Sequence, residues 1–160
     1  MSISAGDKMP SGSFTVMGAE GPEALSTDEL FSGKKVVLVS VPGAFTPTCS
    51  KGHLPGYINQ AEDLTGKGVD TIACMAVNDV FVMDAWGKDR GVGDKVVMLA
   101  DGNGDYTAAL GLELDASGFG MGQRGQRFAI VVDDGTATHV AVEEPGAFEV
   151  SKAEAILASL

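Results

Sequence analysis

A valine-rich stretch, Lys35–Val41, places the strongest constraint on how this chain can fold. Because successive rather than alternate residues are apolar, it predicts a strand that is buried on both faces of a sheet. Such a sheet needs a cover of helices on each side. The Pro/Gly-rich segment Pro42–Thr48 follows directly, and a helical pattern begins after it. The sequence therefore predicts a strand, a loop and a helix in succession at this point.

Other patterns predict further strands and helices along the chain. Short apolar runs predict strands at residues 14–17, 69–77, 96–100, 128–132 and 138–142. Helical periodicity and capping signals predict helices at residues 48–64 and 106–110, one short helical turn after residue 26, and a C-terminal helix from residue 151. A further helix, capped by either Asn78 or Asp79, is predicted to run to about Lys88.

Local signals mark where several of these elements begin, bend or turn. Ser26–Glu29 and Ser151–Glu154 both match the capping box, in which a serine and a glutamate satisfy the first N–H groups of a helix. Pro55 lies inside a helical pattern and predicts a kink there. The pair Asp134–Gly135 lies between two apolar runs, so it predicts a β-hairpin.

The order of the elements indicates a fold class. It is β-α-β-α-β, followed by a short helix, a hairpin and a last helix. Parallel strands joined by crossover helices, with an antiparallel hairpin added, indicate an α/β protein whose mixed central sheet is covered by helices on both faces. This is the thioredoxin-like pattern. With 160 residues and no repeat or long linker, the chain is predicted to form a single domain over residues 1–160.

The charge of the chain argues against two classes of partner. The net charge is −11, and such a surface repels nucleic-acid phosphates and anionic lipid headgroups. No apolar run approaches the roughly 18 residues of a membrane-spanning helix, and no secretory signal is visible at the first residues. We therefore expect a cytoplasmic protein with no nucleic-acid or membrane partner. An organellar form that has lost a transit peptide stays open as an alternative.

Cys49 lies where the helix after the valine-rich strand is expected to begin. Backbone N–H groups at a helix start have no intrahelical partner, and the helix dipole adds positive potential there. Both effects favour a thiolate, which is the nucleophilic form of cysteine. The polar neighbours Thr46, Thr48, Ser50 and Lys51 also suit a reactive cysteine better than a structural one.

The other motifs of the chain carry less chemistry. Cys74 lies within an apolar run and is interpreted as a buried strand residue; since it forms no CxxC pair with Cys49, neither a dithiol motif nor a zinc site is indicated. Gly120–Gly125 matches GxGxxG without the strand and helix that a dinucleotide site needs, so it is interpreted as a flexible loop near the active site. The acidic residues of 101–105 lack the glycine and glutamate of a calcium loop.

The residues around Cys49 resemble those of the peroxiredoxins. Pro42, Thr46 and Cys49 match the PxxxTxxC pattern of that family, and the wider segment is similar to its peroxiredoxin 5 branch, which is also called type II or atypical. The resemblance covers nearly the whole chain. It is carried by the segments VPGAFTPTCSKGHLPGY, GVDTIACMAVNDVFVMDAW, MGQRGQRFAIVVDDG and VEEPGAFEVSKAEAIL.

This resemblance implies a role for each residue of the motif. Cys49 would attack a peroxide and become a sulfenic acid. Thr46 would bind the sulfur and the peroxide, while Pro42 would shield the thiolate from water. The backbone amides of Thr48 and Cys49 would face the substrate. Arg127 would stabilise both the thiolate and the charge that develops on the leaving oxygen, and it is expected to open a strand beside the valine-rich strand.

Further residues are expected to support this site. Arg124 is the close rival of Arg127 and would be its supporting partner. His53, four residues after Cys49, is interpreted as a supporting hydrogen-bonding residue, with a Cys–His nucleophile pair as the alternative. The resemblance also suggests that some aromatic residues line an apolar pocket for alkyl peroxides and the contact of a homodimer. The aromatic candidates are Phe45, Phe81, Trp86 and Phe119.

The chain departs from the two-cysteine members of the branch, which carry a resolving cysteine near the C-terminus, because Ser151 stands in that region. We therefore expect oxidised Cys49 to be reduced by an external thiol, either glutathione with glutaredoxin or thioredoxin. Cys74 as an internal resolving cysteine is the alternative. No metal, haem or flavin is implied. Two other functions remain open: a redox sensor that passes its oxidation to a partner, and a dimeric binding or chaperone-like module.

Overall fold

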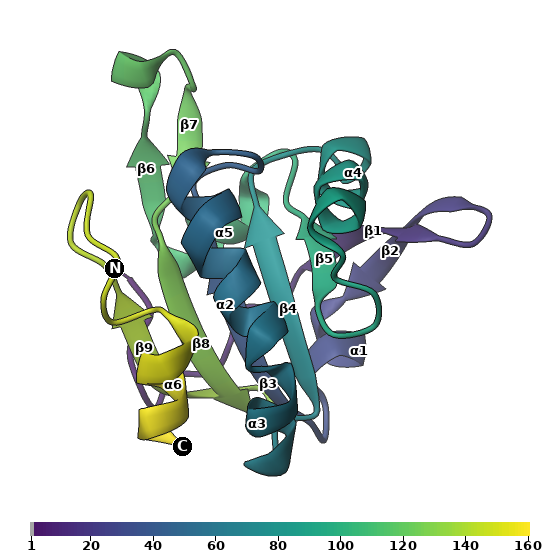
Figure 1. The fold of residues 1–160 in the computed structure, drawn as a ribbon, viewed down its shortest axis with the longest axis vertical. Helices are drawn as coiled ribbons and strands as arrows, with labels where there is room; N and C mark the ends of the chain where they lie inside the picture. Colours follow the sequence, from purple (N-terminus) through teal and green to yellow (C-terminus); the bar gives the residue numbers. More distant parts are fainter. Residues whose placement is uncertain (1) are drawn as a thin grey trace.

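The computed structural model describes residues 2–160, which are arranged around one large sheet (Figure 1). Its strands are β1 (Ser13–Gly18), β2 (Gly21–Ser26), β3 (Lys35–Ser40), β4 (Thr71–Ala76), β5 (Val97–Ala100), β8 (Phe128–Asp133) and β9 (Thr136–Val142). They are ordered β2-β1-β5-β4-β3-β8-β9. The pairs β3–β4 and β4–β5 are parallel, and the other pairs are antiparallel. The predicted mixed central sheet is confirmed.

Helices cover both faces of this sheet, as predicted. They are α1 (Thr27–Phe31), α2 (Leu54–Asn59), α3 (Ala61–Gly66), α4 (Val80–Arg90), α5 (Asp105–Leu110) and α6 (Ala153–Ser159). One hydrophobic core packs α2, α3, α4 and α6 on one face. A second core packs α1 and α5 on the opposite face. Within residues 2–160, no helix has both the length and the apolar character needed to cross a membrane.

Strand β3 shows why its sequence is apolar throughout. Val37 and Val39 belong to the core beneath α2 and α4, whereas Val36 and Leu38 belong to the core beneath α1 and α5. All four are fully buried. Burying one such side chain stabilises the fold by about 1.5–3 kcal/mol, so both layers depend on this strand. It is therefore a rigid base for the loop that carries Cys49.

The predicted hairpin turn and two of the predicted helix caps are confirmed. Asp134 and Gly135 form the hairpin turn between β8 and β9 with φ angles of 47° and 81°, the left-handed conformations that a type I′ turn requires. The capping box of Ser26 and Glu29 opens α1. Asp79, rather than Asn78, caps α4 by accepting a hydrogen bond from the first turn.

The helix predicted at residues 48–64 is interrupted, but not by a kink at Pro55. It includes a π-helical turn at Cys49–His53, continues as α2 and ends at Gln60, after which α3 follows. Pro55 lies in the first turn of α2, where the missing N–H of a proline is tolerated. The irregular turn therefore lies before the proline and contains Cys49 itself.

Two other local expectations need correction, and one edge strand was not expected. Ser151 does not cap the C-terminal helix: α6 has Lys152 at its N-cap and no side-chain cap, because the Ser151 hydroxyl donates to Glu143 Oε2 at 2.7 Å instead. The segment around residue 120 is not simply a flexible loop, because β7 (Gln123–Gly125) pairs with β6 (Glu113–Asp115) in a two-stranded ribbon. Strand β2 was not predicted, because its residues are mostly exposed and it begins with a Gly-Pro pair. It can still form because it lies at the edge of the sheet, where a proline is tolerated.

Candidate active site

The sheet register brings Arg127 to the end of β3 that leads into the Cys49 loop. Strand β8 runs antiparallel to β3 with Phe128 opposite Ser40, so the residue just before β8 lies at the carboxyl end of β3. The Ser40 hydroxyl donates a hydrogen bond of 2.9 Å to the carbonyl of Gln126 and fixes this approach. The prediction that Arg127 opens a strand beside the valine-rich strand is confirmed.

The Cys49 sulfur lies between two polar side chains. Arg127 Nη2 donates a hydrogen bond to Sγ at 3.1 Å, and Thr46 Oγ1 lies 2.8 Å from the same atom. The Thr46 hydroxyl also lies 2.7 Å from the carbonyl oxygen of Gly43. Since a hydroxyl has a single proton, it donates to one of these acceptors at a time and can turn to the sulfur of a thiolate. Cys49 is 0% exposed, despite its polar sequence neighbours.

His53 holds the other arm of the Arg127 guanidinium. Arg127 Nη1 lies 2.9 Å from His53 Nδ1. Because a guanidinium can only donate, Nδ1 must accept, and His53 Nε2 is then the protonated nitrogen that donates to the Ser151 carbonyl at 3.1 Å. Burial, and then the charge of Arg127, lower the pKa of His53 to about 3. The imidazole is therefore neutral at physiological pH.

A neutral partner leaves the charge of Arg127 available to the sulfur. Within residues 2–160 the ion pairs are Lys88–Asp84 and Arg90–Asp89, and neither involves Arg127. A carboxylate partner would draw the positive charge away from Cys49, whereas the imidazole fixes the position of the guanidinium without neutralising it. No hydrogen bond joins His53 to Cys49 in the described part of the chain. In this geometry His53 contacts Arg127 and the Ser151 carbonyl, as the interpretation of a supporting hydrogen-bonding residue predicts.

The segment before α6 anchors His53 through buried polar contacts. The Ser151 carbonyl accepts hydrogen bonds from His53 Nε2 and from the Tyr57 hydroxyl, the latter at 2.6 Å. The amide and hydroxyl of Ser151 donate to Glu143 Oε2 at 2.9 and 2.7 Å, and the Glu149 amide donates to the same oxygen at 2.8 Å. Burial alone raises the pKa of Glu143, but these hydrogen bonds outweigh it and lower the pKa.

Phe148 closes this cluster over Arg127. The guanidinium carbon lies 5.8 Å from the centre of the Phe148 ring, within the range of a cation–π contact. The same ring meets His53 edge to face at 5.2 Å between centroids. Sequence reasoning missed Phe148, Tyr57 and Glu143 as parts of the site. Their places in the sequence show only an aromatic in a loop, a helical apolar position and the end of a strand, so no local signal distinguishes them.

A cavity of about 610 Å³ opens beside Arg127. Pro42, Thr48 and Phe119 line it, so the structure gathers these three predicted site residues at one opening. Leu114 adds to the apolar wall. Phe119 is 86% exposed and therefore stands at the rim. Arg127 and Gln126 add polar groups to the lining, so the cavity offers both apolar and polar contacts to a bound molecule.

Arg124 lies near this site but does not touch the reactive atoms. Its Nε donates to the Met121 carbonyl at 2.9 Å, and its Nη1 donates to the Val77 carbonyl at 2.8 Å. These bonds hold the β6–β7 ribbon against the carboxyl end of β4. Arg124 therefore supports the walls of the site rather than Arg127 itself.

Cys74 is a buried residue of β4, as interpreted from the sequence. It belongs to the same hydrophobic core as Cys49, and both thiols are free. Burial, and then the proximity of Cys49, raise the pKa of Cys74, so its thiol stays protonated. Among residues 2–160, no cluster of three or more His, Cys, Asp or Glu side chains could hold a metal ion.

Known proteins are similar to this chain in sequence and in fold. The sequence model of the Redoxin family matches residues 4–157. Peroxiredoxin-2E, chloroplastic, from Arabidopsis thaliana is 47% identical over 163 residues, which cover 99% of this chain and 70% of that protein. The chain belongs to the redoxin family and is a peroxiredoxin.

Two solved structures agree with this peroxiredoxin in fold. Reduced Prx3 in complex with hydrogen peroxide from Vibrio vulnificus has a TM-score of 0.94 and 52% identity, with 98% of each chain covered. Peroxiredoxin 5 from Alvinella pompejana has a TM-score of 0.87 and 36% identity, with coverage of 98% and 97%. The predicted family and thioredoxin-like fold are confirmed. As a peroxiredoxin, the protein is a thiol-dependent peroxidase with an antioxidant role.

The stability of the peroxiredoxin is expected to fall between pH 7.5 and 5.5 because of His53. An unfolded histidine has a pKa of about 6.5, whereas the pKa of folded His53 is about 3. Between these values the unfolded chain binds a proton that the folded protein does not, so acid favours unfolding. The expected loss is about 1.4 kcal/mol in the free energy of unfolding, measured by urea denaturation at the two pH values.

The other histidine provides the control for this prediction. His53→Gln should remove the pH dependence, while His139→Gln should keep it, since His139 lies in β9 away from Arg127. A pH dependence that persists in His53→Gln would contradict the assignment of a buried neutral imidazole.

Proposed function

We propose that this peroxiredoxin reduces hydrogen peroxide and organic hydroperoxides with Cys49 as its nucleophile. The observation that supports this most strongly is the pair of contacts at the sulfur, with Arg127 Nη2 at 3.1 Å and Thr46 Oγ1 at 2.8 Å. A cation and a hydroxyl in these positions stabilise a thiolate and can also bind a peroxide oxygen beside it. The neutral His53 keeps the cation directed at the sulfur.

In the proposed first step, the Cys49 thiolate attacks one peroxide oxygen. An S–O bond forms, the O–O bond breaks, and an electron pair passes from the sulfur to the leaving oxygen. The leaving alkoxide or hydroxide takes up a proton and departs as an alcohol or water, which leaves a sulfenic acid. Arg127 and Thr46 stabilise the charge on the oxygens, Pro42 limits access of water, and the amides of Thr48 and Cys49 provide further donors.

For the second half of the cycle we propose reduction by an external thiol. The thiol attacks the sulfenic acid to give a mixed disulfide and water, and a second thiolate then releases Cys49 as a disulfide forms between the two reductant sulfurs. Glutathione with glutaredoxin, or thioredoxin, would supply these thiols. The buried, protonated thiol of Cys74, and the serine instead of a cysteine at position 151, support an external rather than an internal resolver. This chemistry uses no metal, haem or flavin.

The cavity beside Arg127 supports the proposal of organic substrates. Its wall includes the apolar side chains of Leu114 and Phe119, which suit the alkyl or aryl group of a hydroperoxide.

Two exposed aromatic side chains support the proposal of a homodimer: Phe45 is 50% exposed and Phe81 is 65% exposed. We also propose that residues 1–160 form a single domain and that the protein is cytoplasmic. An organellar form is the alternative, because Peroxiredoxin-2E is a chloroplastic protein.

The test follows oxidation and turnover separately. Equimolar hydrogen peroxide should convert Cys49 to a sulfenic acid, detected by mass spectrometry after trapping with dimedone. Excess glutathione with glutaredoxin, or thioredoxin with its reductase, should then sustain peroxide consumption. Cys74→Ser should retain more than about half of the wild-type rate, because a buried structural thiol takes no part in the cycle.

Each outcome of this experiment has a defined meaning. A Cys49–Cys74 disulfide formed during turnover, together with loss of turnover in Cys74→Ser, would contradict the external resolver. Rapid oxidation of Cys49 without turnover in either reductant system would support the redox sensor instead. Peroxide consumption that leaves Cys49 unmodified would contradict the proposed nucleophile.

A further inference from the structure

The π turn at Cys49–His53 leaves one backbone carbonyl without a helical partner. The amide of Leu54 donates to the carbonyl of Cys49, five residues earlier, instead of to Ser50. The next residue is Pro55, which has no N–H to give. The Ser50 carbonyl therefore lacks both of the donors that an α-helix or a continued π-helix would supply. This carbonyl belongs to the residue directly after Cys49.

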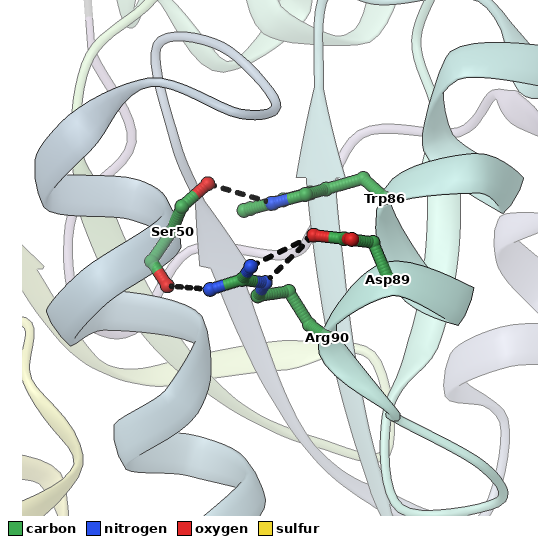
Figure 2. A network of polar contacts seen from close by, with 4 residues as sticks. All are labelled: Ser50, Trp86, Asp89 and Arg90. Carbon is green, nitrogen blue, oxygen red and sulfur yellow. Dashed lines mark hydrogen bonds and ion pairs between the residues drawn. The ribbon is translucent and has the colours of Figure 1, made fainter.

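Helix α4 supplies the missing donor (Figure 2). Arg90 Nη1 donates to the Ser50 carbonyl at 3.1 Å, and Trp86 Nε1 donates to the Ser50 hydroxyl at 2.9 Å. Figure 2 shows both side chains reaching from α4 to Ser50. Asp89 Oδ2 accepts hydrogen bonds from Arg90 Nε at 3.0 Å and Nη2 at 2.8 Å, which orients the guanidinium. Ser50 is thus bound to α4 through its backbone and its side chain.

We propose that Arg90 is a positioning residue that holds the Cys49 turn wound and controls access of external thiols to the sulfur. The inference rests on the proposed function of Cys49. In the wound state Cys49 is 0% exposed, so the thiol of a protein or other bulky reductant reaches Sγ only when the turn opens. Because Arg90 binds the carbonyl that the helix itself leaves unpaired, its loss favours the opened turn. Peroxide is small and reacts in the wound state.

Arg90→Met should therefore change two rates in different ways. The side chain of Arg90 is 35% exposed, so we expect a moderate effect: labelling of Cys49 by a polymer-linked maleimide should become about fivefold to tenfold faster. The rate constant for oxidation of Cys49 by hydrogen peroxide should stay within about twofold of wild type or fall. A change in thiolate reactivity alone would move both rates in the same direction. Mass spectrometry identifies the labelled cysteine.

Three further variants separate positioning from a general loss of structure. Lys88→Met removes the same charge from α4, but Lys88 pairs with Asp84 and does not bind Ser50, so its labelling rate should match wild type. Arg90→Lys keeps a donor and should give an intermediate rate. Pro55→Ala provides a new N–H five residues after Ser50. In that background Arg90→Met should change labelling by less than about twofold, because the carbonyl has a backbone donor again.

The inference is overturned if Arg90→Met labels at the rate of Lys88→Met, or if its effect is the same with and without Pro55→Ala. Thermal unfolding followed by circular dichroism checks each variant. If Arg90→Met proves unstable, an Arg90→Lys rate equal to wild type in a folded protein overturns the inference as well. Maleimide labelling requires no turnover, so this test remains decisive even if peroxide consumption does not depend on Cys49. Failure of the proposed function and failure of this inference are thus distinguishable.

Discussion

Cys49→Ser is expected to abolish peroxide consumption, with a loss of at least about 10³-fold in kcat/KM. A serine hydroxyl is not ionised at neutral pH and attacks a peroxide oxygen poorly, whereas the thiolate is a strong nucleophile. The substitution changes one buried atom and leaves Thr46 and Arg127 in place. The measurement is hydrogen peroxide consumption under excess reductant, with Cys74→Ser as the control in which the other cysteine is removed.

This experiment also needs a measure of folding, because Cys49 is fully buried. Oxygen is smaller than sulfur, so the substitution leaves a small gap in the core, while Arg127 can donate to a hydroxyl as well as to a thiol. We expect the free energy of unfolding to change by no more than about 1–2 kcal/mol in urea denaturation. Residual turnover above a tenth of wild type in folded Cys49→Ser would refute the assignment of Cys49 as the nucleophile.

Arg127→Met is expected to lower the rate of Cys49 oxidation by about 10²–10³-fold. It removes the 3.1 Å hydrogen bond to Sγ and the only cation that donates to this atom among the hydrogen bonds of residues 2–160. It also leaves His53 Nδ1 without its donor. The measurement is the second-order rate constant with hydrogen peroxide, followed by loss of the free thiol.

Two other substitutions test whether geometry or charge alone explains this effect. Arg127→Lys keeps the charge, but an ammonium cannot reproduce the planar fork that bonds His53 and Cys49 together, so it should restore only part of the rate. Arg124→Met removes an identical charge three residues away. Because Arg124 binds backbone carbonyls instead of the sulfur, its loss should cost less than about tenfold. Equal losses in Arg124→Met and Arg127→Met would show that the effect is structural.

Much of the fold was predictable from local patterns. The valine-rich β3, the Asp134–Gly135 turn and the Ser26 capping box involve residues close together in the chain, so their conformations follow from side-chain type and spacing. The wrong prediction for Ser151 has a tertiary cause. Ser151 matches a capping box, but its hydroxyl has a stronger acceptor in the buried carboxylate of Glu143. A local capping interaction is replaced when a charged group from a distant part of the chain accepts a stronger hydrogen bond.

Part of the candidate site was likewise predictable from the sequence, and part was not. The motif of Pro42, Thr46 and Cys49 was visible because its members lie within one loop, and the family resemblance added Arg127. The position of His53 was visible, but its partners were not. Nothing in the sequence shows that the imidazole would bind Arg127 on one side and the Ser151 carbonyl on the other, or that Phe148 would cover both.

By itself the sequence determined most strands and helices, the family and the thiol that carries the chemistry, because apolar periodicity, turn chemistry and motif spacing act over short distances along the chain. Only the tertiary structure decided how this thiol is surrounded. Arg127 reaches Cys49 across 78 residues, and the Ser151 carbonyl reaches His53 across 98. Such contacts depend on the register of β3 against β8 and on how α4 and the segment before α6 pack, which no local pattern specifies.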